Sequence, residues 1–404
     1  MRPIRHSLAL ATLALAAGAQ AQISDNVVKI GILTDMAGPY SGMGGAGSVV
    51  AAKMAVDDCL KAECKDLKIE VVSADHQNKA DIAATKAREW LDRDKVDALA
   101  DLTNSAAALA VQKLIKEKGG IAMYSGPATT RLTEDDCAEN GFHWMFDTYS
   151  SAAGAAVALT KAGDKSWYFI TVDYAFGHSL EKDASDMVKA NGGQVLGSVR
   201  HPLNASDFSS FILQAQNSKA QVIGLANGAQ DTVNAIKAAR EFGITGAKGQ
   251  KVAALLMFLT DVHSLGLRQA QGLMFSEGFY WDMDDKTRAF SARFEKLHKG
   301  FKPTMVQAGV YSSVLHYLKS VAAAKTDDWK VVAQKMRELP IADPVMRNAS
   351  IRPDGRVIHD MYLFQVKTPA ESKGAWDYYK TVSTIPAQTA FKPLAESTCP
   401  LVKK

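Results

Sequence analysis

The chain has 404 residues, four cysteines and a formal net charge of +4. Because this charge is near neutral and no block of lysine and arginine is present, we expect no nucleic acid partner. The length exceeds what one hydrophobic core usually supports and is typical of two.

The N-terminus has the features of a secretory signal peptide. Arg2 and Arg5 precede the apolar run 8–17, and the Ala-Gln-Ala sequence at 19–21 fits the small-residue cleavage pattern. Removing residues 1–21 takes two arginines away and lowers the formal charge to +2. A short membrane anchor is the alternative, but the run is shorter than the ~20 residues that a spanning helix needs. We therefore predict an exported protein.

Residues 27–58 are predicted to form a strand, a glycine-rich loop and a helix. The strand is 27–34, and helix-compatible residues run from 48 to 58. A loop that follows a strand and leads into a helix presents N–H groups and the positive end of the helix dipole, so it favours a carboxylate or phosphate. Gly42–Gly47 also matches GxGxxG, but residues 35–41 separate it from the strand, unlike a dinucleotide site. A nucleotide-dependent enzyme using this loop is therefore kept only as an alternative of another class.

Strand-like and helix-like runs then alternate about every thirty residues, in two series. Strands are predicted at 67–73, 96–101, 120–125, 167–172, 193–200 and 221–226, with helices between them. Such alternation predicts an α/β fold with two lobes, each a doubly wound parallel sheet. Further strands are predicted at 272–281, 361–366 and 376–384, and helices at 287–299, 306–324 and 329–339.

We predict that the chain crosses between the lobes three times, near Asp147, Phe279 and Arg352. Lobe 1 would then comprise residues 22–148 and 279–351, and lobe 2 residues 149–278 and 352–404.

Cys59, Cys64, Cys137 and Cys399 form an even set, which in an exported protein suggests disulfides. The short spacing favours Cys59 with Cys64 and leaves Cys137 with Cys399, although spacing does not prove this connectivity. A zinc site is the alternative, but no CxxC pair or His/Cys cluster accompanies the cysteines.

Polar residues follow the predicted strands of lobe 1 at three places: Tyr40-Ser41, Thr103-Asn104-Ser105 and Thr129-Thr130. Any one of them is better explained as a helix cap, but three at one sheet edge indicate a ligand site. Aromatic residues gather at strand-to-helix junctions and predicted crossovers, which is typical of a small-molecule pocket. Since HExxH and nucleophile-elbow motifs are absent from the sequence, we predict a binding protein without cofactor, metal or enzymatic activity.

Four segments together resemble the periplasmic substrate-binding proteins of ABC importers, of the branched-chain amino acid (Leu/Ile/Val) binding type. They read VKIGILTDMAGPYSGMGG, YSGPATTRLT, VDYAFGHSLEKD and DFSSFILQAQNSKAQVIGLANGAQDTVNAIKAAREFGI. The resemblance covers essentially the whole mature chain. It implies the type I periplasmic binding protein fold, a periplasmic location, a monomer, and ABC permease and ATPase subunits as partners.

The resemblance also implies roles for particular positions. The ligand carboxylate would be held at Asn104 or Ser105 and at Ala128, Thr129 and Thr130, beneath the Tyr40-Ser41 loop. Lobe 2 would contribute Phe176. An acid that meets the substrate ammonium in amino acid binders falls near Asp261, but FLTDVHSLG departs from the family's usual sequence there.

The segments FYWDMDDKTRAF and YLFQVKTPAESKGAWDYYK look more like the subgroup that takes up aromatic carboxylates of the benzoate or hydroxycinnamate type. Asp261 would then be free to bind a ring hydroxyl. Branched-chain amino acid or amide binding is the alternative. The complete set of candidate ligand-binding residues is Tyr40, Ser41, Asn104, Ser105, Ala128, Thr129, Thr130, Tyr149, Phe176, Asn227, Asp261 and Trp281.

Overall fold

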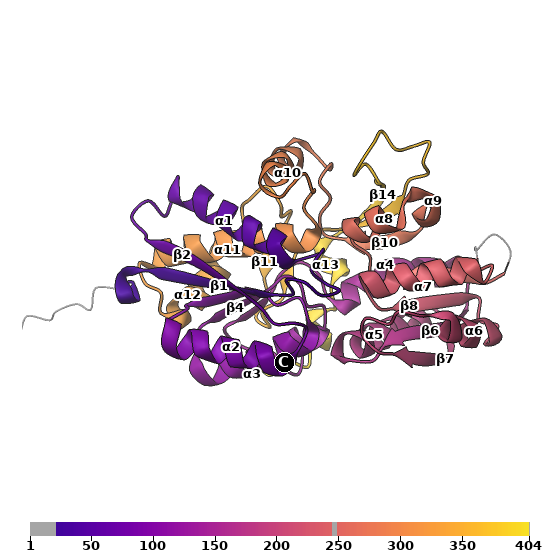
Figure 1. Cartoon of the computed structure of the whole chain (residues 1–404). Helices are drawn as coiled ribbons and strands as arrows, with labels where there is room; N and C mark the ends of the chain where they lie inside the picture. Colours follow the sequence, from indigo (N-terminus) through magenta and orange to yellow (C-terminus); the bar gives the residue numbers. More distant parts are fainter. Residues whose placement is uncertain (1–21, 245–248, 404) are drawn as a thin grey trace, which may run out of the picture.

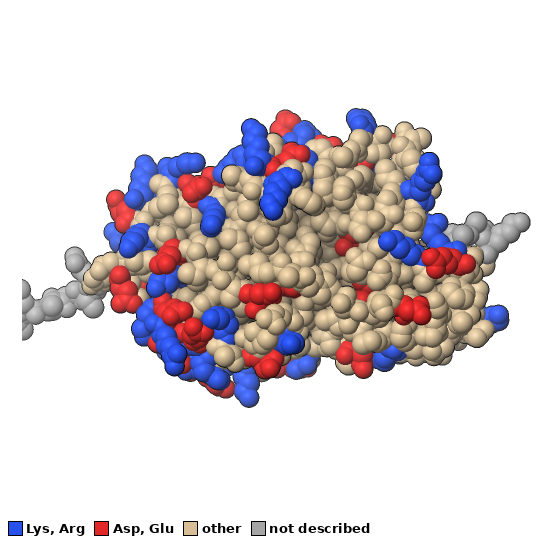
Figure 2. All heavy atoms as spheres, viewed as in Figure 1, with Lys and Arg blue, Asp and Glu red and all other residues tan. Residues whose placement is uncertain are grey.

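A computed structural model describes residues 22–244 and 249–403 as two lobes lying side by side (Figure 1). The predicted signal peptide, residues 1–21, lies outside the described residues. Within the described part of the chain, no helix combines the length and apolarity needed to cross a membrane. Basic and acidic side chains are interspersed on the face shown in Figure 2.

Lobe 1 is built on a parallel sheet with strand order β2-β1-β3-β4-β5. Residues of β1 alternate between its two faces: Ile30 and Ile32 pack toward α1 and α11, and Leu33 packs toward α2 and α3 (Figure 1). Both faces are therefore covered, as period-2 alternation in a wholly apolar strand requires. The strands are β1 (Val28–Thr34), β2 (Ile69–Asp75), β3 (Ala98–Asp101), β4 (Ile121–Tyr124) and β5 (Gly141–His143). The helices are α1 (Gly45–Leu60), α2 (Ala80–Glu89), α3 (Ser105–Lys118), α10 (Asp285–Leu297), α11 (Met305–Ala324) and α12 (Trp329–Glu338).

Lobe 2 has a second parallel sheet with strand order β7-β6-β8-β9 and an antiparallel sheet β10-β13-β14 beside it. Helices α4 and α5 cover one face of the parallel sheet, and α6 and α7 cover the other. The strands are β6 (Ser166–Val172), β7 (Gln194–His201), β8 (Val222–Ala226), β9 (Lys251–Ala254), β10 (Met274–Glu277), β13 (Met361–Val366) and β14 (Tyr379–Ile385). The helices are α4 (Thr148–Lys161), α5 (Ala175–Ala190), α6 (Ser209–Asn217), α7 (Gln230–Glu241), α8 (Leu259–Leu265) and α9 (Leu267–Ala270).

Short elements complete the chain. They are the 3-10 helices η1 (Ser24–Asn26), η3 (Thr130–Thr133) and η4 (Leu394–Glu396), the π-helical turn η2 (Trp90–Asp94), the hairpin strands β11 (Ser350–Ile351) and β12 (Val357–Ile358), and α13 (Ala387–Ala390). The fold class is the predicted one, two lobes of parallel sheet with flanking helices.

The last part of the chain differs from the predicted division of 279–351 in lobe 1 and 352–404 in lobe 2. Arg356 pairs with His143 at the edge of the lobe 1 sheet, and its guanidinium donates to the carbonyls of Trp144 and Phe146. The β11–β12 hairpin thus extends lobe 1, and the chain enters lobe 2 only after Ile358, beyond Arg352.

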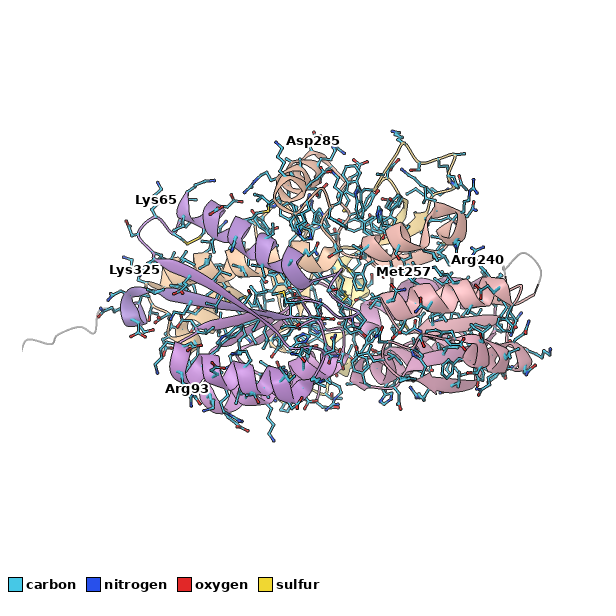
Figure 3. All side chains as sticks on the ribbon, viewed as in Figure 1. Lys65, Arg93, Arg240, Met257, Asp285 and Lys325 are labelled. Atoms are coloured by element: carbon cyan, nitrogen blue, oxygen red, sulfur yellow. A yellow bond between two sulfur atoms is a disulfide. The ribbon has the colours of Figure 1, made fainter. Side chains whose placement is uncertain are left out.

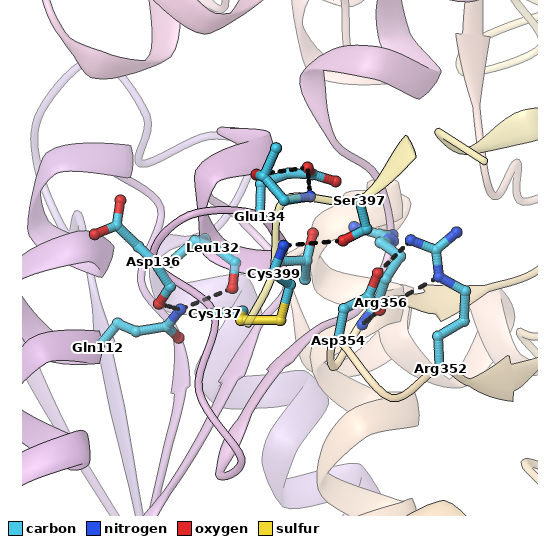
Figure 4. The surroundings of a disulfide bond; sticks show 12 residues. Gln112, Leu132, Glu134, Asp136, Cys137, Arg352, Asp354, Arg356, Ser397 and Cys399 are labelled. Atoms are coloured by element: carbon cyan, nitrogen blue, oxygen red, sulfur yellow. Dashed lines mark hydrogen bonds and ion pairs between the residues drawn. A yellow bond between two sulfur atoms is a disulfide. The ribbon is translucent and has the colours of Figure 1, made fainter. Parts of the chain in front are cut away.

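The C-terminal tail then returns to lobe 1, again unlike the predicted division. Cys399 is bonded to Cys137, and Glu134 accepts hydrogen bonds from Lys392 and from the Thr398 N–H (Figure 4). The second disulfide joins Cys59 to Cys64, so the pairs are those favoured by spacing, and the zinc alternative does not apply to these cysteines.

Candidate functional site

A small cavity lies between the lobes, where the carboxyl ends of both parallel sheets meet. The lining side chains nearly fill it and leave room of only about 10 Å3. Lobe 1 lines it with Tyr40, Met43, Thr103, Ser105, Gly126 and Ala128, and lobe 2 with Tyr174, Phe176, Gly228, Leu256 and Phe258. Met257, between two lining residues, is buried near the junction of the lobes (Figure 3).

A larger hollow of about 310 Å3 lies within lobe 2, between α4, α7 and the edge strand β9. Its lining is mostly aliphatic and includes Ile236, Leu273 and Met274. Ligands of open parallel sheets bind at the carboxyl ends of the strands. We therefore assign the functional site to the smaller cavity between the lobes.

Aromatic rings from both lobes wall this cavity. The hydroxyls of Tyr40 and Tyr174 lie 2.7 Å apart across the cleft, and the rings of Tyr174 and Phe176 are 5.9 Å apart. Burial raises the pKa of both tyrosines, so their hydroxyls stay neutral. The loop that carries Tyr40 is held by the Asp35 carboxylate, which accepts from the N–H groups of Gly38 at 2.6 Å and Tyr40 at 2.8 Å.

Ser105, the first residue of α3, forms a polar corner of the cavity. Asn104 caps this helix by accepting from the N–H groups of Ala106 and Ala107, a cap that leaves the N–H of Ser105 unused. The Ser105 hydroxyl oxygen accepts from the N–H groups of Ala128 and Thr129, both at 3.3 Å. Amides and the positive end of a helix therefore converge where a carboxylate would be stabilised.

Among the described residues, those that line the cavity include no charged side chain. Asp101 lies behind the floor: a Cβ on Gly126 would be 2.7 Å from one of its carboxylate oxygens, and burial raises its pKa to about 6. Asp231 accepts from the N–H groups of Asn204 and Ala205, and burial raises its pKa to about 6. Neither carboxylate is among the described lining residues, although the charge of Asp231 is close enough to raise the pKa of Tyr40 and Tyr174.

Four of the predicted ligand-binding residues line the cavity together: Tyr40, Ser105, Ala128 and Phe176. The other four from lobe 1 make different contacts. Ser41 donates to the Gly38 carbonyl, and Asn104 serves as the α3 cap. The hydroxyls of Thr129 and Thr130 face α5 of lobe 2 rather than the cavity.

The remaining predicted residues are also outside the lining. Asn227 bonds to His201 and Thr232, and Tyr149 packs against the core at the start of α4. Asp261 accepts from the N–H of Phe258 at 2.9 Å, and burial raises its pKa to about 7. Trp281 donates to the carbonyl of Trp376 at 2.7 Å. Contact of any of the predicted residues with a ligand stays a prediction.

Thr103, from the predicted sheet-edge set, and Tyr174, one of the junction aromatics, also line the cavity although they were not among the twelve candidates. Five lining residues were missed altogether: Met43, Gly126, Gly228, Leu256 and Phe258. Gly126 and Gly228 each lie two residues after a strand, β4 and β8, so the rule that ligands bind at strand ends could have found them. Leu256 and Phe258 follow β9, whose four residues were too few to be recognised as a strand.

Two sheet lobes joined by crossovers, with a small cavity between their strand ends, define a clamp that holds a small molecule. The chain belongs to the periplasmic binding protein family, whose model matches residues 27–375. Family members are the solute-binding components of ABC transporters rather than enzymes, which implies a periplasmic location, a small-molecule ligand and permease partners.

Three similar proteins illustrate the relationship. A periplasmic binding protein from Burkholderia mallei is 50% identical, with a TM-score of 0.90, covering 94% of this chain and 100% of its own. A branched chain amino acid ABC transporter periplasmic ligand-binding protein from Burkholderia xenovorans LB400 is 41% identical, with a TM-score of 0.83, covering 93% and 100%. Leu/Ile/Val-binding protein homolog 6 from Brucella melitensis is 24% identical over 395 residues, which is 94% of this chain and 97% of that protein.

Proposed function

We propose that this protein captures a small aromatic carboxylate, of the benzoate or hydroxycinnamate type, and delivers it to an ABC permease. The single observation that carries this proposal is the lining of the cavity: rings of Tyr40, Tyr174, Phe176 and Phe258, with no charged side chain among the described lining residues. Flat apolar walls and a polar corner suit a planar acid.

The carboxylate would occupy the corner formed by Ser105 and the N–H groups of Ala128 and Thr129. These amides now reach a neutral hydroxyl at 3.3 Å, a weak contact. An anionic oxygen would accept shorter, charge-assisted hydrogen bonds from the same donors. The ring would then lie between Tyr40 of lobe 1 and Phe176 of lobe 2, and the lining side chains must move apart to admit it, because only about 10 Å3 is free between them. Since the ring would contact both lobes, the ligand favours the closed arrangement.

Branched-chain amino acid binding is the second candidate, because the Burkholderia xenovorans protein carries that name. An amino acid would need an acidic partner for its ammonium. Asp261 is committed to the N–H of Phe258 and does not line the cavity, which favours the aromatic acid. The fold itself holds aromatic acids: a Rhodopseudomonas palustris solute-binding protein, 21% identical with a TM-score of 0.80, was solved with 4-hydroxybenzoate.

Thermal unfolding in the presence of benzoate, 4-hydroxybenzoate, 4-hydroxycinnamate, leucine and leucinamide tests the proposal. A ligand at a hundredfold excess over its Kd stabilises the folded protein by about 2.7 kcal/mol, so an aromatic acid should raise Tm while leucine should not. Stabilisation by leucine but by none of the aromatic acids would instead establish the amino acid alternative.

Calorimetric titration of variants then locates the site. Tyr40→Ala and Phe176→Ala should each weaken binding of the stabilising acid at least tenfold, because each removes one ring from the cavity wall. Tyr168→Ala removes a ring of lobe 2 outside the cavity and is the matched control. Unchanged affinity in both cavity variants would rule out this cleft, and titration with NAD, which should give no heat, tests the nucleotide alternative.

A further inference from the structure

Three hydrogen bonds reach from lobe 1 across the cleft to the start of α5 in lobe 2. The hydroxyl of Tyr40 lies 2.7 Å from the hydroxyl of Tyr174, the residue preceding α5. The Thr129 hydroxyl meets that of Ser179 at 2.7 Å. The Thr130 hydroxyl donates to the Asp183 carboxylate at 3.3 Å. Ser179 and Asp183 are four residues apart and therefore lie on the same face of the helix.

The lobe 1 segment that α5 contacts is the one that supplies amides to the ligand cavity. Ala128 lines the cavity, and the N–H groups of Ala128 and Thr129 point to Ser105. The side chains of Thr129 and Thr130 point in the opposite direction, toward Ser179 and Asp183. The same few residues thus face the ligand with their backbone and the other lobe with their side chains.

We propose that Ser179 and Asp183 are positioning residues: they bind Thr129 and Thr130 when the lobes close, and so hold the N–H groups of residues 128–130 in place for the ligand. We call these two contacts, Thr129–Ser179 and Thr130–Asp183, the grip. This inference rests on the proposed function only in that the ligand occupies this cleft. The four partners are all side chains of the protein, so these bonds require no atom of the ligand. The grip therefore favours closure and presents a preformed corner at the same time.

The surroundings of Asp183 make this grip sensitive to pH. Its carboxylate is partly buried and accepts from Thr148 at 2.5 Å and from Thr130. Its pKa is raised to about 6, chiefly by burial and also by the neighbouring charge of Asp147, while the hydrogen bonds from Thr148 and Thr130 and the charge of Lys182 oppose the shift.

Tyr149 of α4 also lies near Asp183; burial and, to a smaller extent, the charge of Asp183 raise the pKa of this phenol, so Tyr149 stays neutral between pH 5 and pH 8. The charged groups around Asp183 are engaged elsewhere. Asp147 lies 3.6 Å from the buried guanidinium of Arg356, and Lys182 pairs with Asp186 at 2.7 Å. From lobe 1, Arg131 next to Thr130 pairs with Asp136 at 2.7 Å. None of these cations bonds to the Asp183 carboxylate in the described part of the chain. No ion pair therefore offsets the cost of burying this carboxylate when the lobes close.

The direction of the pH effect follows. When the lobes separate, Asp183 regains water and its pKa falls toward the ordinary value, so the closed form binds more protons than the open form. Closure is therefore favoured at low pH, and this advantage is lost as the pH rises through about 6. We expect ligand affinity to fall several-fold between pH 5 and pH 8.

The experiment compares wild type with Ser179→Ala, Asp183→Ala and Asp183→Asn. Asp186→Asn is the control, since Asp186 lies one turn away on the same helix and bonds to Lys182 rather than to lobe 1 in the part of the chain that the structure describes. Small-angle scattering of the ligand-free protein at pH 5 and pH 8 measures closure, and calorimetric titration with 4-hydroxybenzoate measures affinity. Circular dichroism confirms that each variant is folded.

Wild type and Asp186→Asn should be more compact, and bind more tightly, at pH 5 than at pH 8. Asp183→Asn keeps an acceptor oxygen without a charge, so it should stay compact at both values, whereas Ser179→Ala and Asp183→Ala should be less compact at both. A wild-type pH response in Asp183→Asn, or unchanged scattering in both alanine variants, would overturn the inference. If 4-hydroxybenzoate fails to bind while scattering responds as expected, the choice of ligand is wrong and the grip stands.

Discussion

Gly228 offers a test of the cavity that leaves the fold intact. A Cβ at this position would lie 3.5 Å from Leu256 and 3.6 Å from Phe176, both ordinary contact distances, and its backbone conformation suits an L residue. Gly228→Ala should therefore fold normally but place a methyl group in a cavity that has only about 10 Å3 of free room. Overfilling a packed site costs about 1–3 kcal/mol, so affinity measured by titration should fall about tenfold or more.

Gly42→Ala is the matched control for this substitution. Its Cβ would lie 3.8 Å from Thr260 and outside the cavity lining, so affinity should be unchanged. Equal affinity of wild type and Gly228→Ala would show that the ligand lies elsewhere.

At the level of single residues, the sequence predicted the position of the cavity better than it predicted which side chains line it. It placed Thr103, Asn104 and Ser105 together after a strand. Thr103 and Ser105 line the cavity, whereas the side chain of Asn104, which stands between them, caps α3. Neighbouring residues at a strand end point in different directions, and the direction depends on the exact start of the following helix. In the same way, Ala128 lines the cavity whereas the side chain of Thr129 contacts α5.

Among the elements, α4 begins at the first crossover with a capping box that is also part of a buried charge pair. The Asp147 carboxylate accepts from the N–H of Ser150 at 2.7 Å, and the Ser150 hydroxyl accepts from the N–H of Asp147 at 3.0 Å. Asp147 is also the acid beside buried Arg356. Asp147→Ala removes both the cap and the acid, so we expect it to lower the free energy of unfolding by more than the ~1 kcal/mol typical of a cap.

Two further substitutions separate the cap from the charge pair. Asp147→Asn keeps a capping oxygen and should destabilise mainly through Arg356. Asp328→Ala removes the exposed cap of α12, which has no buried cation, and should cost only the cap. Urea unfolding followed by circular dichroism gives the three values. If Asp147→Ala costs no more than Asp328→Ala, Arg356 does not depend on Asp147.

Elements in which hydrophobic residues recur with a clear period were predictable, and several short elements were not. The apolar run of β1 and the helices α11 and α12 were expected within a few residues of their bounds, because their hydrophobic patterns extend over whole elements. β9 and the two-residue strands of the β11–β12 hairpin are too short to show a period. Their pairing depends on residues distant in sequence, such as the contact of Arg356 with His143.

For the whole molecule, the return of the tail to lobe 1 could not be read from composition. Residues 391–403 contain little regular structure, and their position depends on Cys137, on Glu134 and on the bond from Arg352 to the Lys392 carbonyl. The two-lobe arrangement itself was predictable, because two separate series of alternating strands and helices each need their own core.

The two disulfides differ chiefly in the length of chain that they close, and this difference predicts their contributions to stability. All four cysteines are buried, but the bonded residues are 262 positions apart in Cys137–Cys399 and 5 apart in Cys59–Cys64. Chain-entropy estimates give roughly 5 kcal/mol for the long loop and roughly 2 kcal/mol for the short one. The Cys137→Ser/Cys399→Ser variant should therefore lose more unfolding free energy in urea than Cys59→Ser/Cys64→Ser, and hydrogen exchange should show the tail released from Glu134. Equal losses would mean that the contacts of Lys392 and Thr398 hold the tail without the covalent bond.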